Sequence, residues 1–239
     1  KSVTNELKRI RTIESEMRDR WIKDEENWRK LPARAWPEYQ PNYGDIPMLT
    51  ALMNDHCVDA INVNDDKNSS LCRTTTFNLA TALLFNNVDA RKALSLYEKV
   101  AESGDVRGFT GAGMCLIEGL GSLEKDFPRG IQHLQAAVAE NYPQALYDLG
   151  VLYYNGLAEP HIYEDSVKAF QLFERAASYG HTSALYMVAD MCMLGDGCNI
   201  DFARGVSLLY RAGENGHRHA RATLLTILNE DKLLNNQSL

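Results

Sequence analysis

The sequence predicts an all-α fold, a right-handed α-solenoid of helix-loop-helix repeats, because the chain repeats itself with fixed spacings. The segment 145–156 aligns position for position with 184–195, and more loosely with 108–119. Each segment runs 11 residues from a small residue to a glycine, and 19 residues separate a recurring aspartate from the next unit. Only the connection between these blocks varies, from 3 to 9 residues. Internal repeats of this kind decide the fold before any other signal.

Both constant blocks are predicted to be helices. Small and apolar residues recur at steps of three and four, as at Ala145, Leu149 and Leu152, and therefore share one helical face. Each block ends in a residue that tolerates positive φ, such as Gly156, with Asn141 and Asn86 in place of glycine at two of these stops. Neither helix can bury its apolar stripe alone, so each hairpin must stack on its neighbours.

Residues 73–234 form the predicted repeat domain, and residues 1–72 form an N-terminal extension of different character. In the first repeat only the second helix follows the pattern closely. A last helix is expected to follow the final repeat, up to about residue 234. The four repeats are expected at about 75–107, 108–144, 145–183 and 184–219.

The N-terminal extension is expected to contain both helical and extended segments. Apolar residues with near-heptad spacing predict an amphipathic helix over 3–30. Four prolines between residues 32 and 47 exclude a helix there. Residues 47–57 are expected to form a short helix, and residues 62–70 a surface loop.

Two interpretations of this extension remain open. It can pack on the first repeat as a cap, or it can dock on a partner protein through its large aromatic side chains, which dominate the energetics of interfaces. On the second interpretation the partner-binding residues of the extension are Trp21, Trp28, Trp36 and Tyr39.

The repeat beginning at Ala145 carries a family resemblance. Its string Ala-Leu-Tyr-Asp-Leu-Gly-Val-Leu-Tyr-Tyr-Asn-Gly, followed by Asp165, Phe173 and Gly180-His181, resembles the Sel-one-like repeat, a longer-looped relative of the tetratricopeptide repeat. The resemblance implies an α-solenoid whose members act as adaptors that hold other proteins together. It implies no catalytic residue.

Charge is divided unevenly along the chain. Residues 1–34 carry ten Lys and Arg against seven Asp and Glu, whereas the remainder carries fifteen against twenty-five. Proteins that bind nucleic acid need a basic surface. The acidic repeat domain therefore argues against nucleic-acid binding, and an RNA-binding helical repeat protein is kept only as an alternative. No apolar run reaches the roughly 18 residues of a membrane span, so we expect no transmembrane segment, although the chain can still associate with a membrane complex.

The cysteines show no pairing pattern. They are odd in number, and none forms a C-x-x-C pair or recurs with the repeat. This predicts free thiols and an intracellular reducing compartment, cytoplasmic or mitochondrial. The five residues are Cys57, Cys72, Cys115, Cys192 and Cys198.

No motif of an active site or a metal site accompanies the repeats. The nucleophile elbow, the phosphate loop and the H-E-x-x-H zinc helix are missing, and no cysteine cluster accompanies His217 and His219. His181 and His217 follow the closing glycine of a repeat, where the resemblance implies a structural role. We therefore expect no enzyme, no metal and no other cofactor. An enzyme with an unrecognised hydrolytic site in the solenoid groove is kept as an alternative.

These observations predict a non-catalytic protein-protein interaction scaffold, which would be an adaptor, a structural subunit or an assembly factor of a larger multiprotein complex. Its expected partners are proteins. On the solenoid, the predicted partner-binding positions are first-helix residues that packing does not fix. They are Asp148, Tyr154, Met187, Asp190 and Met193.

Overall fold

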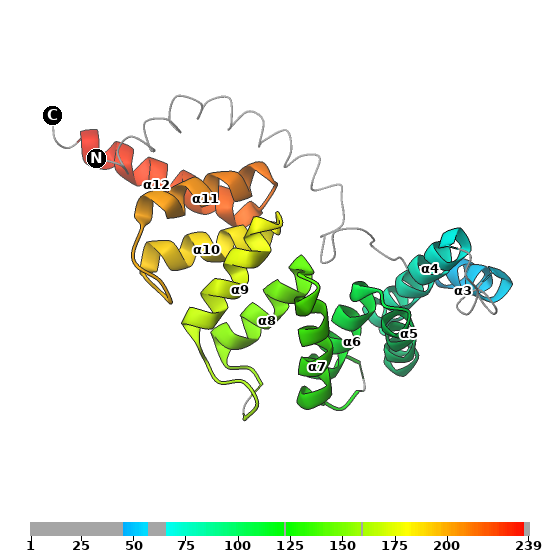
Figure 1. The fold of residues 1–239 in the computed structure, drawn as a ribbon. Coiled ribbons are helices and arrows are strands. Elements are labelled where there is room, and N and C mark those ends of the chain that lie inside the picture. Colours follow the sequence, from blue (N-terminus) through cyan, green and yellow to red (C-terminus); the bar gives the residue numbers. More distant parts are fainter. Residues whose placement is uncertain (1–44, 57–65, 122, 159, 237–239) are drawn as a thin grey trace. The chain divides into compact units, whose positions relative to one another are not determined.

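The described part of the chain is helical. The computed structural model describes residues 45–56, 66–121, 123–158 and 160–236, and in these ranges Figure 1 shows helices joined by loops, with no β-strand. The all-α prediction is confirmed. In chain order the helices are α3 (Asp45–His56), α4 (Asp66–Phe85), α5 (Ala90–Glu102), α6 (Val106–Glu118), α7 (Phe127–Ala139), α8 (Pro143–Asn155), α9 (Ser166–Ser178), α10 (Thr182–Leu194), α11 (Phe202–Glu214) and α12 (Arg218–Asn236).

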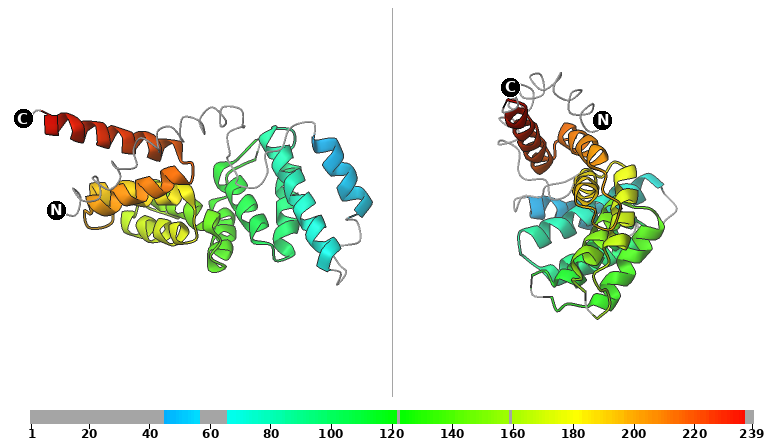
Figure 2. Two further views of the ribbon diagram at one scale, coloured as in Figure 1. Left: turned by 90° about the horizontal axis from the view of Figure 1, so that it is seen from above. Right: turned by 90° about the vertical axis from the view of Figure 1, so that its left-hand side faces the viewer.

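The helices belong to two compact units, the N-unit and the C-unit. The N-unit holds α3 to α7 and the beginning of α8 up to Asp148, together with residues 158, 160 and 161. The C-unit holds α8 from Leu149 to its end and α9 to α12. In the N-unit the helices from α3 to α7, and in the C-unit the helices from α9 to α12, pack side by side in the order of the sequence (Figure 2). We call α4, α6, α8, α10 and α12 first helices, and α5, α7, α9 and α11 second helices.

The aspartate that recurs in each repeat caps the second helix. Its carboxylate accepts the backbone N–H three residues further on, at 2.9 to 3.2 Å, in all four cases. In three of the four repeats its own N–H donates, at 2.8 Å, to a carbonyl late in the preceding first helix. The loop is therefore fixed at its far end whatever its length. The caps are Asp89, Asp126, Asp165 and Asp201, and the carbonyls belong to Leu116, Tyr153 and Cys192.

The predicted helix stops are confirmed with one correction. Gly119 and Gly195 close α6 and α10 in the left-handed conformation, with φ of 65° and 78°. Asn141 takes the same region with φ of 57°. The prediction of Asn86 is wrong by one residue, because Asn87 holds the positive φ of 53°. Asn86 directly follows the last residue of α4, and its side chain donates a 2.8 Å hydrogen bond to the Ala82 carbonyl.

Close helix contacts depend on small residues inside each unit. In the C-unit, a Cβ at Gly150 would lie 2.7 Å from the ring of Phe173, which is fully buried. In the N-unit, a Cβ at Gly113 would lie 3.0 Å from the carbonyl oxygen of Gly130. The separation at Gly150 is shorter than real Cβ contacts, and that at Gly113 is tighter than most of them, so larger side chains would force neighbouring atoms apart.

The start of the described chain agrees only in part with expectation. The short helix predicted over 47–57 is present as α3. The loop predicted over 62–70 is wrong for residues 66–70, which form the first turn of α4. This helix is held in place by tertiary packing, since Thr81 shares a buried 2.9 Å hydrogen bond with Tyr97 of α5. The predicted boundary after residue 72 falls within α4, and the division into extension and repeat domain stays a prediction.

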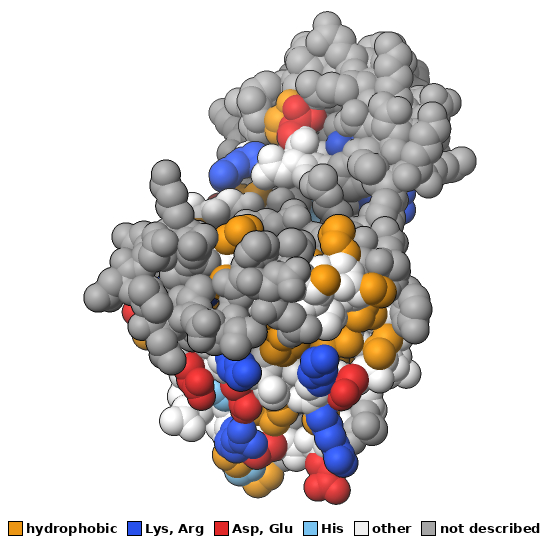
Figure 3. All heavy atoms as spheres, turned by 90° about the vertical axis from the view of Figure 1, so that its right-hand side faces the viewer, with side chains coloured by type: hydrophobic (Ala, Val, Ile, Leu, Met, Phe, Trp, Pro, Cys, Tyr) orange, Lys and Arg blue, Asp and Glu red, His pale blue; other side chains and the backbone are white. Residues whose placement is uncertain are grey.

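Several predictions fall outside the described residues. These include the amphipathic helix over 3–30, the proline-containing segment up to residue 44 and the docking residues Trp21, Trp28, Trp36 and Tyr39. Residues 45 and 46, where the prolines were expected to exclude a helix, begin α3, so that prediction is wrong there. Figure 3 views the end of the N-unit formed by α3 to α5, where hydrophobic side chains lie next to acidic and basic ones. Met48 and Leu71 are exposed there, at 56% and 58%.

The prediction of free thiols is wrong for Cys72. This residue is buried and disulfide-bonded, and Cys57 lies outside the described residues. Cys115, Cys192 and Cys198 are free, and burial raises the pKa of the Cys115 thiol to about 12, with a smaller contribution from Glu118. An odd cysteine count does not exclude one pair, so the thiols no longer support a reducing compartment. Among the described helices, none has the length and apolar composition that a membrane crossing requires.

Candidate partner-binding site

The first helices of the N-unit enclose a pocket of about 440 Å³. Its apolar walls come from α4, α6 and the loop after α6, and its polar groups come from α6, α8 and the loop after α4. Glu118 and Phe85 are exposed, whereas Asp148 is buried. The pocket is therefore polar at its inner end and open at Phe85 and Glu118. The lining residues are Leu84, Phe85, Asn87, Met114, Glu118, Leu120, Gly121, Gln144 and Asp148.

Asp148 is the only predicted groove residue that lines this pocket, and its environment is unusual for a carboxylate. The residue is 7% exposed. One oxygen, Oδ1, accepts a 2.9 Å hydrogen bond from Nε2 of Gln144, and no described residue donates to Oδ2. Burial raises the pKa of Asp148 to about 7, the nearby Glu118 raises it further, and the bond from Gln144 opposes the rise. The pocket therefore holds a carboxyl group that is incompletely hydrogen-bonded.

A second group of predicted residues meets in the C-unit, around Tyr154 at the end of α8. The Tyr154 ring packs on Phe173 of α9, with ring centroids 6.3 Å apart. Its hydroxyl donates a hydrogen bond to Asp196, in the loop after α10. Burial raises the pKa of Tyr154, and the neighbouring carboxylates Asp196, Asp190 and Glu164 raise it further. This surface is acidic and lies at the first-helix side of the C-unit.

Met187, Asp190 and Met193 follow one another on α10 at steps of three, and thus share a helix face. All three are partly buried. Burial, followed by repulsion from Asp196, raises the pKa of Asp190. Met193 also packs on α11, because a Cβ at Gly205 would collide with its side chain. The structure thus brings Tyr154 and Asp190 together through Asp196, whereas Asp148 belongs to the other unit.

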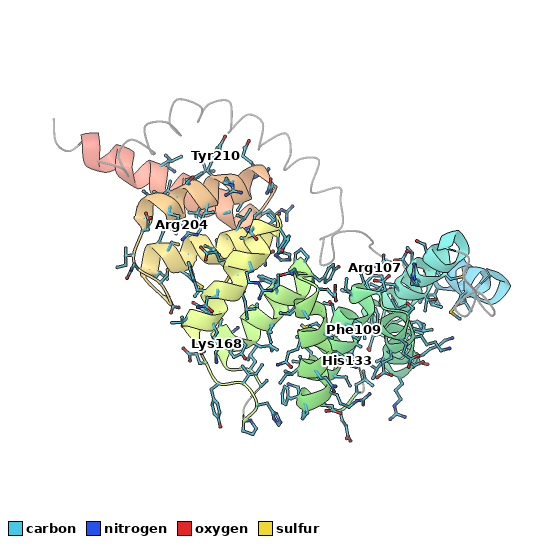
Figure 4. The ribbon with its side chains drawn as sticks, in the orientation of Figure 1. Arg107, Phe109, His133, Lys168, Arg204 and Tyr210 are labelled. Carbon is cyan, nitrogen blue, oxygen red and sulfur yellow. The ribbon has the colours of Figure 1, made fainter. Side chains whose placement is uncertain are left out.

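The second helices carry a different kind of surface, made of ion pairs between neighbouring repeats. In the N-unit, Arg129 of α7 pairs with Glu98 of α5 at 2.7 Å. In the C-unit, Arg204 of α11, which is labelled in Figure 4, pairs with Glu174 of α9. Figure 4 also shows Phe109 on α6 facing His133 on α7, with ring centroids 6.0 Å apart. These contacts hold neighbouring helices together, and the charged side chains that form the ion pairs already have partners within the chain.

His181 and His217 have the structural role that the repeat pattern implied. The Nδ1 atom of His181 accepts the Ala184 N–H at 3.1 Å and caps α10. His217 accepts the Ala220 N–H at 3.2 Å in the same way at α12. Burial, followed by the proximity of His217, lowers the pKa of His181 to about 4, and burial lowers that of His217. Among the described residues, no group of three or more His, Cys, Asp or Glu side chains could hold a metal ion.

Sequence reasoning missed most of the pocket. Phe85, Met114 and Glu118 were not singled out, because they lie on different helices and meet only through tertiary packing. One signal was present in the alignment. Met114 and Asp190 occupy the same position of their first helices, so the predicted importance of Asp190 could have been extended to Met114.

The stacked helix pairs, the left-handed stops and the two first-helix surfaces define a helical-repeat protein. The model of the Sel1 repeat matches residues 87–105, 110–142, 143–181 and 182–217, which together make up more than half of the chain. The chain therefore belongs to the Sel1 repeat family. The first match covers α5 and its flanks but not α4, in agreement with the expectation that only the second helix of the first repeat follows the pattern.

Two curated relatives are fungal regulators. The chain is 30% identical over 125 residues to chitin synthase regulatory factor 1 of Schizosaccharomyces pombe, a match that covers 52% of this chain and 27% of the relative. It is 27% identical over 95 residues to the chitin synthase regulator SKT5 of Saccharomyces cerevisiae, covering 39% of this chain and 14% of the relative. The chain thus spans about a quarter or less of the length of these relatives.

Two solved structures have a similar fold. A Sel1 repeat protein from Oxalobacter formigenes superposes with a TM-score of 0.58 at 21% identity, covering 77% of this chain and 74% of that one. A protective antigen of uropathogenic Escherichia coli superposes with the same TM-score at 20% identity, covering 79% of this chain and 42% of that one. At this level of identity the likeness concerns the fold alone.

Proposed function

We propose that this chain is a non-catalytic scaffold that holds proteins together, acting as an adaptor, subunit or assembly factor of a multiprotein complex. The observation that carries the proposal is that the repeats share the residues that shape their helices but differ at other first-helix positions. The residues that cap and close the helices recur in each repeat, whereas equivalent first-helix positions differ in chemistry. Asp148 corresponds to Met187, and Met114 corresponds to Asp190. Such variation creates distinct binding surfaces without changing the fold.

The names of the curated relatives support a regulatory scaffold. Both are called regulators of an enzyme, chitin synthase. A scaffold that binds an enzyme can regulate it by changing its location or its assembly. For this chain we propose the general role and the binding of protein partners through the first-helix surface and the N-terminal extension.

A matched pair of charge reversals tests the use of the first-helix surface. Asp190→Lys reverses a charge on first helix α10, and Arg175→Glu reverses an exposed charge on second helix α9. Tagged chains of residues 1–239 are used to recover interacting proteins from the native cell, with quantification by mass spectrometry. We expect the Arg175→Glu chain to recover the same proteins as the unmodified chain, and Asp190→Lys to lose at least one of them.

The outcome depends on folded variants, so thermal unfolding is measured for each. Equal recovery by all three chains would remove the C-unit first-helix surface from the proposal. Loss with Arg175→Glu but not with Asp190→Lys would move partner binding to the second helices. If the unmodified chain recovers no protein in stoichiometric amount, the scaffold proposal is wrong.

A further inference from the structure

The pocket of the N-unit combines features that identify the chemistry of an occupant. Two carboxylates, Asp148 and Glu118, line it, and its nine lining residues include no Lys, Arg or His. Its volume of about 440 Å³ falls within the range of roughly 300–1,000 Å³ that is usual for ligand pockets. The pocket is therefore large enough for a long side chain and carries uncompensated negative charge.

The state of Asp148 indicates that the pocket is incomplete without an occupant. A buried polar atom without a hydrogen-bond partner is costly, and buried polar groups in folded proteins are normally satisfied. Asp148 is more than nine-tenths buried, lines the pocket, and has no described donor to Oδ2. Rotation of the carboxyl group is soft, so an entering donor can reach either oxygen. Such a donor would give the unsatisfied carboxylate oxygen a hydrogen-bond partner.

The walls select for a long cation rather than a compact one. Leu84, Met114 and Leu120 supply apolar surface, against which the methylene groups of Arg or Lys pack well. Phe85 at the opening is 50% exposed. A guanidinium group donates two parallel hydrogen bonds to a carboxylate, whereas the ammonium group of lysine acts as a point charge. These features together favour arginine.

We infer that this pocket receives an arginine side chain, preceded or followed by an apolar residue, from a segment of a partner protein. The guanidinium group pairs with Asp148 at the inner end of the pocket, and Glu118 contributes a second negative charge. The apolar neighbour covers Phe85 at the opening. The inference deepens the proposed function and rests on it, because it assigns the chemistry of one partner contact.

Protonation of Asp148 provides a further readout. The groups that face it are Glu118 from α6, Gln144 and Tyr147 from α8, and Asn87 from the loop after α4, while α4 itself contributes Leu84 and Phe85. A cation favours the ionised carboxyl, whose pKa in the free protein is about 7. Binding therefore releases a proton, and affinity should decrease as pH falls below about 7, by at most tenfold per pH unit.

The test uses the full chain with ¹³C-labelled methionine methyl groups, and follows the Met114 signal by NMR. The probe is the dipeptide acetyl-leucyl-arginine amide, and its control is the same dipeptide with citrulline, which has the shape of arginine without its charge. We expect the arginine probe to shift the Met114 signal and to bind about tenfold or more tightly than the citrulline probe. Asp148→Asn should remove this preference, whereas the matched variant Asp190→Asn should keep it.

Four outcomes would overturn the inference. Equal binding of both probes would show that charge does not select the occupant, and an unchanged preference in Asp148→Asn would show that Asp148 does not supply the selecting charge. No shift of Met114 with either probe would show that the pocket does not bind this side chain. Binding that appears only when Arg9, Arg11, Arg18 and Arg20 of the same chain are replaced by Ala would assign the pocket to the chain's own extension. If the pocket fails while Asp190→Lys still loses a partner, the proposed function survives and only this inference is wrong.

Discussion

The two units use the same repeat but place their carboxylates at different depths. In the N-unit, Asp148 lies buried in an apolar pocket, and Met114 forms part of its wall. In the C-unit, the position of Asp148 holds Met187, and that of Met114 holds Asp190, which lies partly exposed beside Tyr154. The two equivalent positions thus hold an acid and a methionine in opposite order in the two units. The N-unit has a pocket there, and the C-unit has an open acidic surface.

The two units should also respond to pH in opposite directions. The pKa of Asp148 is raised in the folded N-unit, so the folded chain keeps a proton that the unfolded chain releases. The pKa of His181 is lowered in the folded C-unit, so there the unfolded chain binds the additional proton. The Asp148 carboxyl therefore makes the protein less stable as pH rises, and the His181 imidazole makes it less stable as pH falls.

The largest expected effect is on protein stability, at a repeat position that holds Gly108 in the N-unit and Ala184 in the C-unit. The N-unit has no room for a Cβ at this position, whereas the C-unit buries one. A Cβ at Gly108 would lie 2.7 Å from the Tyr97 carbonyl oxygen and would collide with other backbone atoms of α5. Gly108→Ala should therefore destabilise the protein by about 2–3 kcal/mol, even though alanine favours the helix. The equivalent Ala184 of the C-unit is fully buried, and Ala184→Gly should cost only about 1–2 kcal/mol.

Urea unfolding of the two variants measures this difference. Hydrogen exchange of α6 and α10 then shows whether each loss stays in its own unit. A smaller effect of Gly108→Ala than of Ala184→Gly would mean that α5 and α6 can separate at little cost, and the close approach at Gly108 would lose its significance.

Gly108 and Ala184 also show which features of the structure the sequence can predict and which it cannot. Helices and their stops depend on residues close in the chain, so the alignment predicts them, with errors of one residue as at Asn87. The aspartate that recurs in every repeat was visible, although its role as a cap needed coordinates. The departure of Gly108 from alanine was visible too, but only the backbone of α5 explains it.

The pocket lay beyond sequence reasoning for a physical reason. Asp148 was predicted as an accessible groove residue, and the structure buries it at 7% exposure. Its burial depends on α4 and α6, and α4 begins where the sequence predicts a loop. Phe85 and Glu118 carry no signal of their own, because the ends of different helices meet only after the repeats stack. The disulfide of Cys72 was missed since an odd cysteine count does not reveal a single pair.

The next effect in size is the pH response of Asp148. Its pKa rises from 3.8 to about 7 on folding, so stability should decrease between about pH 4 and pH 7. Between pH 5.5 and pH 8 the decrease from this group is about 2 kcal/mol at 1.36 kcal/mol per pH unit. Asp148→Asn should remove it and leave the protein more stable than the unmodified chain at pH 8. Urea unfolding at both pH values gives the comparison, and a variant with the same pH response as the unmodified chain would refute the assignment.

A smaller effect of opposite sign is expected in the C-unit. The cap at His181 requires an unprotonated Nδ1, which accepts the Ala184 N–H. Because its pKa is lowered from 6.5 to about 4, the stabilisation is present above about pH 6.5 and decreases as pH falls, by about 1 kcal/mol between pH 6.5 and pH 5.5 at 1.36 kcal/mol per pH unit. His181→Asn should keep the cap without the pH dependence, and His181→Ala should lose it at every pH. Exchange of α10 amides, corrected for intrinsic rates, distinguishes these cases, and equal behaviour of the two variants would contradict the capping role.

The smallest effect is one that the two units should share. Arg129 pairs with Glu98 in the N-unit, and Arg204 pairs with Glu174 in the C-unit, each joining second helices of neighbouring repeats. All four side chains are at least 31% exposed, so water and salt screen them, and each pair should contribute about 0.5 kcal/mol. Double-mutant cycles with alanine, at low salt and at 1 M salt, measure the coupling energies. The two energies should agree within error and fall towards zero at high salt, because the surroundings of the second helices are alike. A coupling that is large and insensitive to salt in only one unit would extend the difference between the units to the surface on which we expect them to be the same.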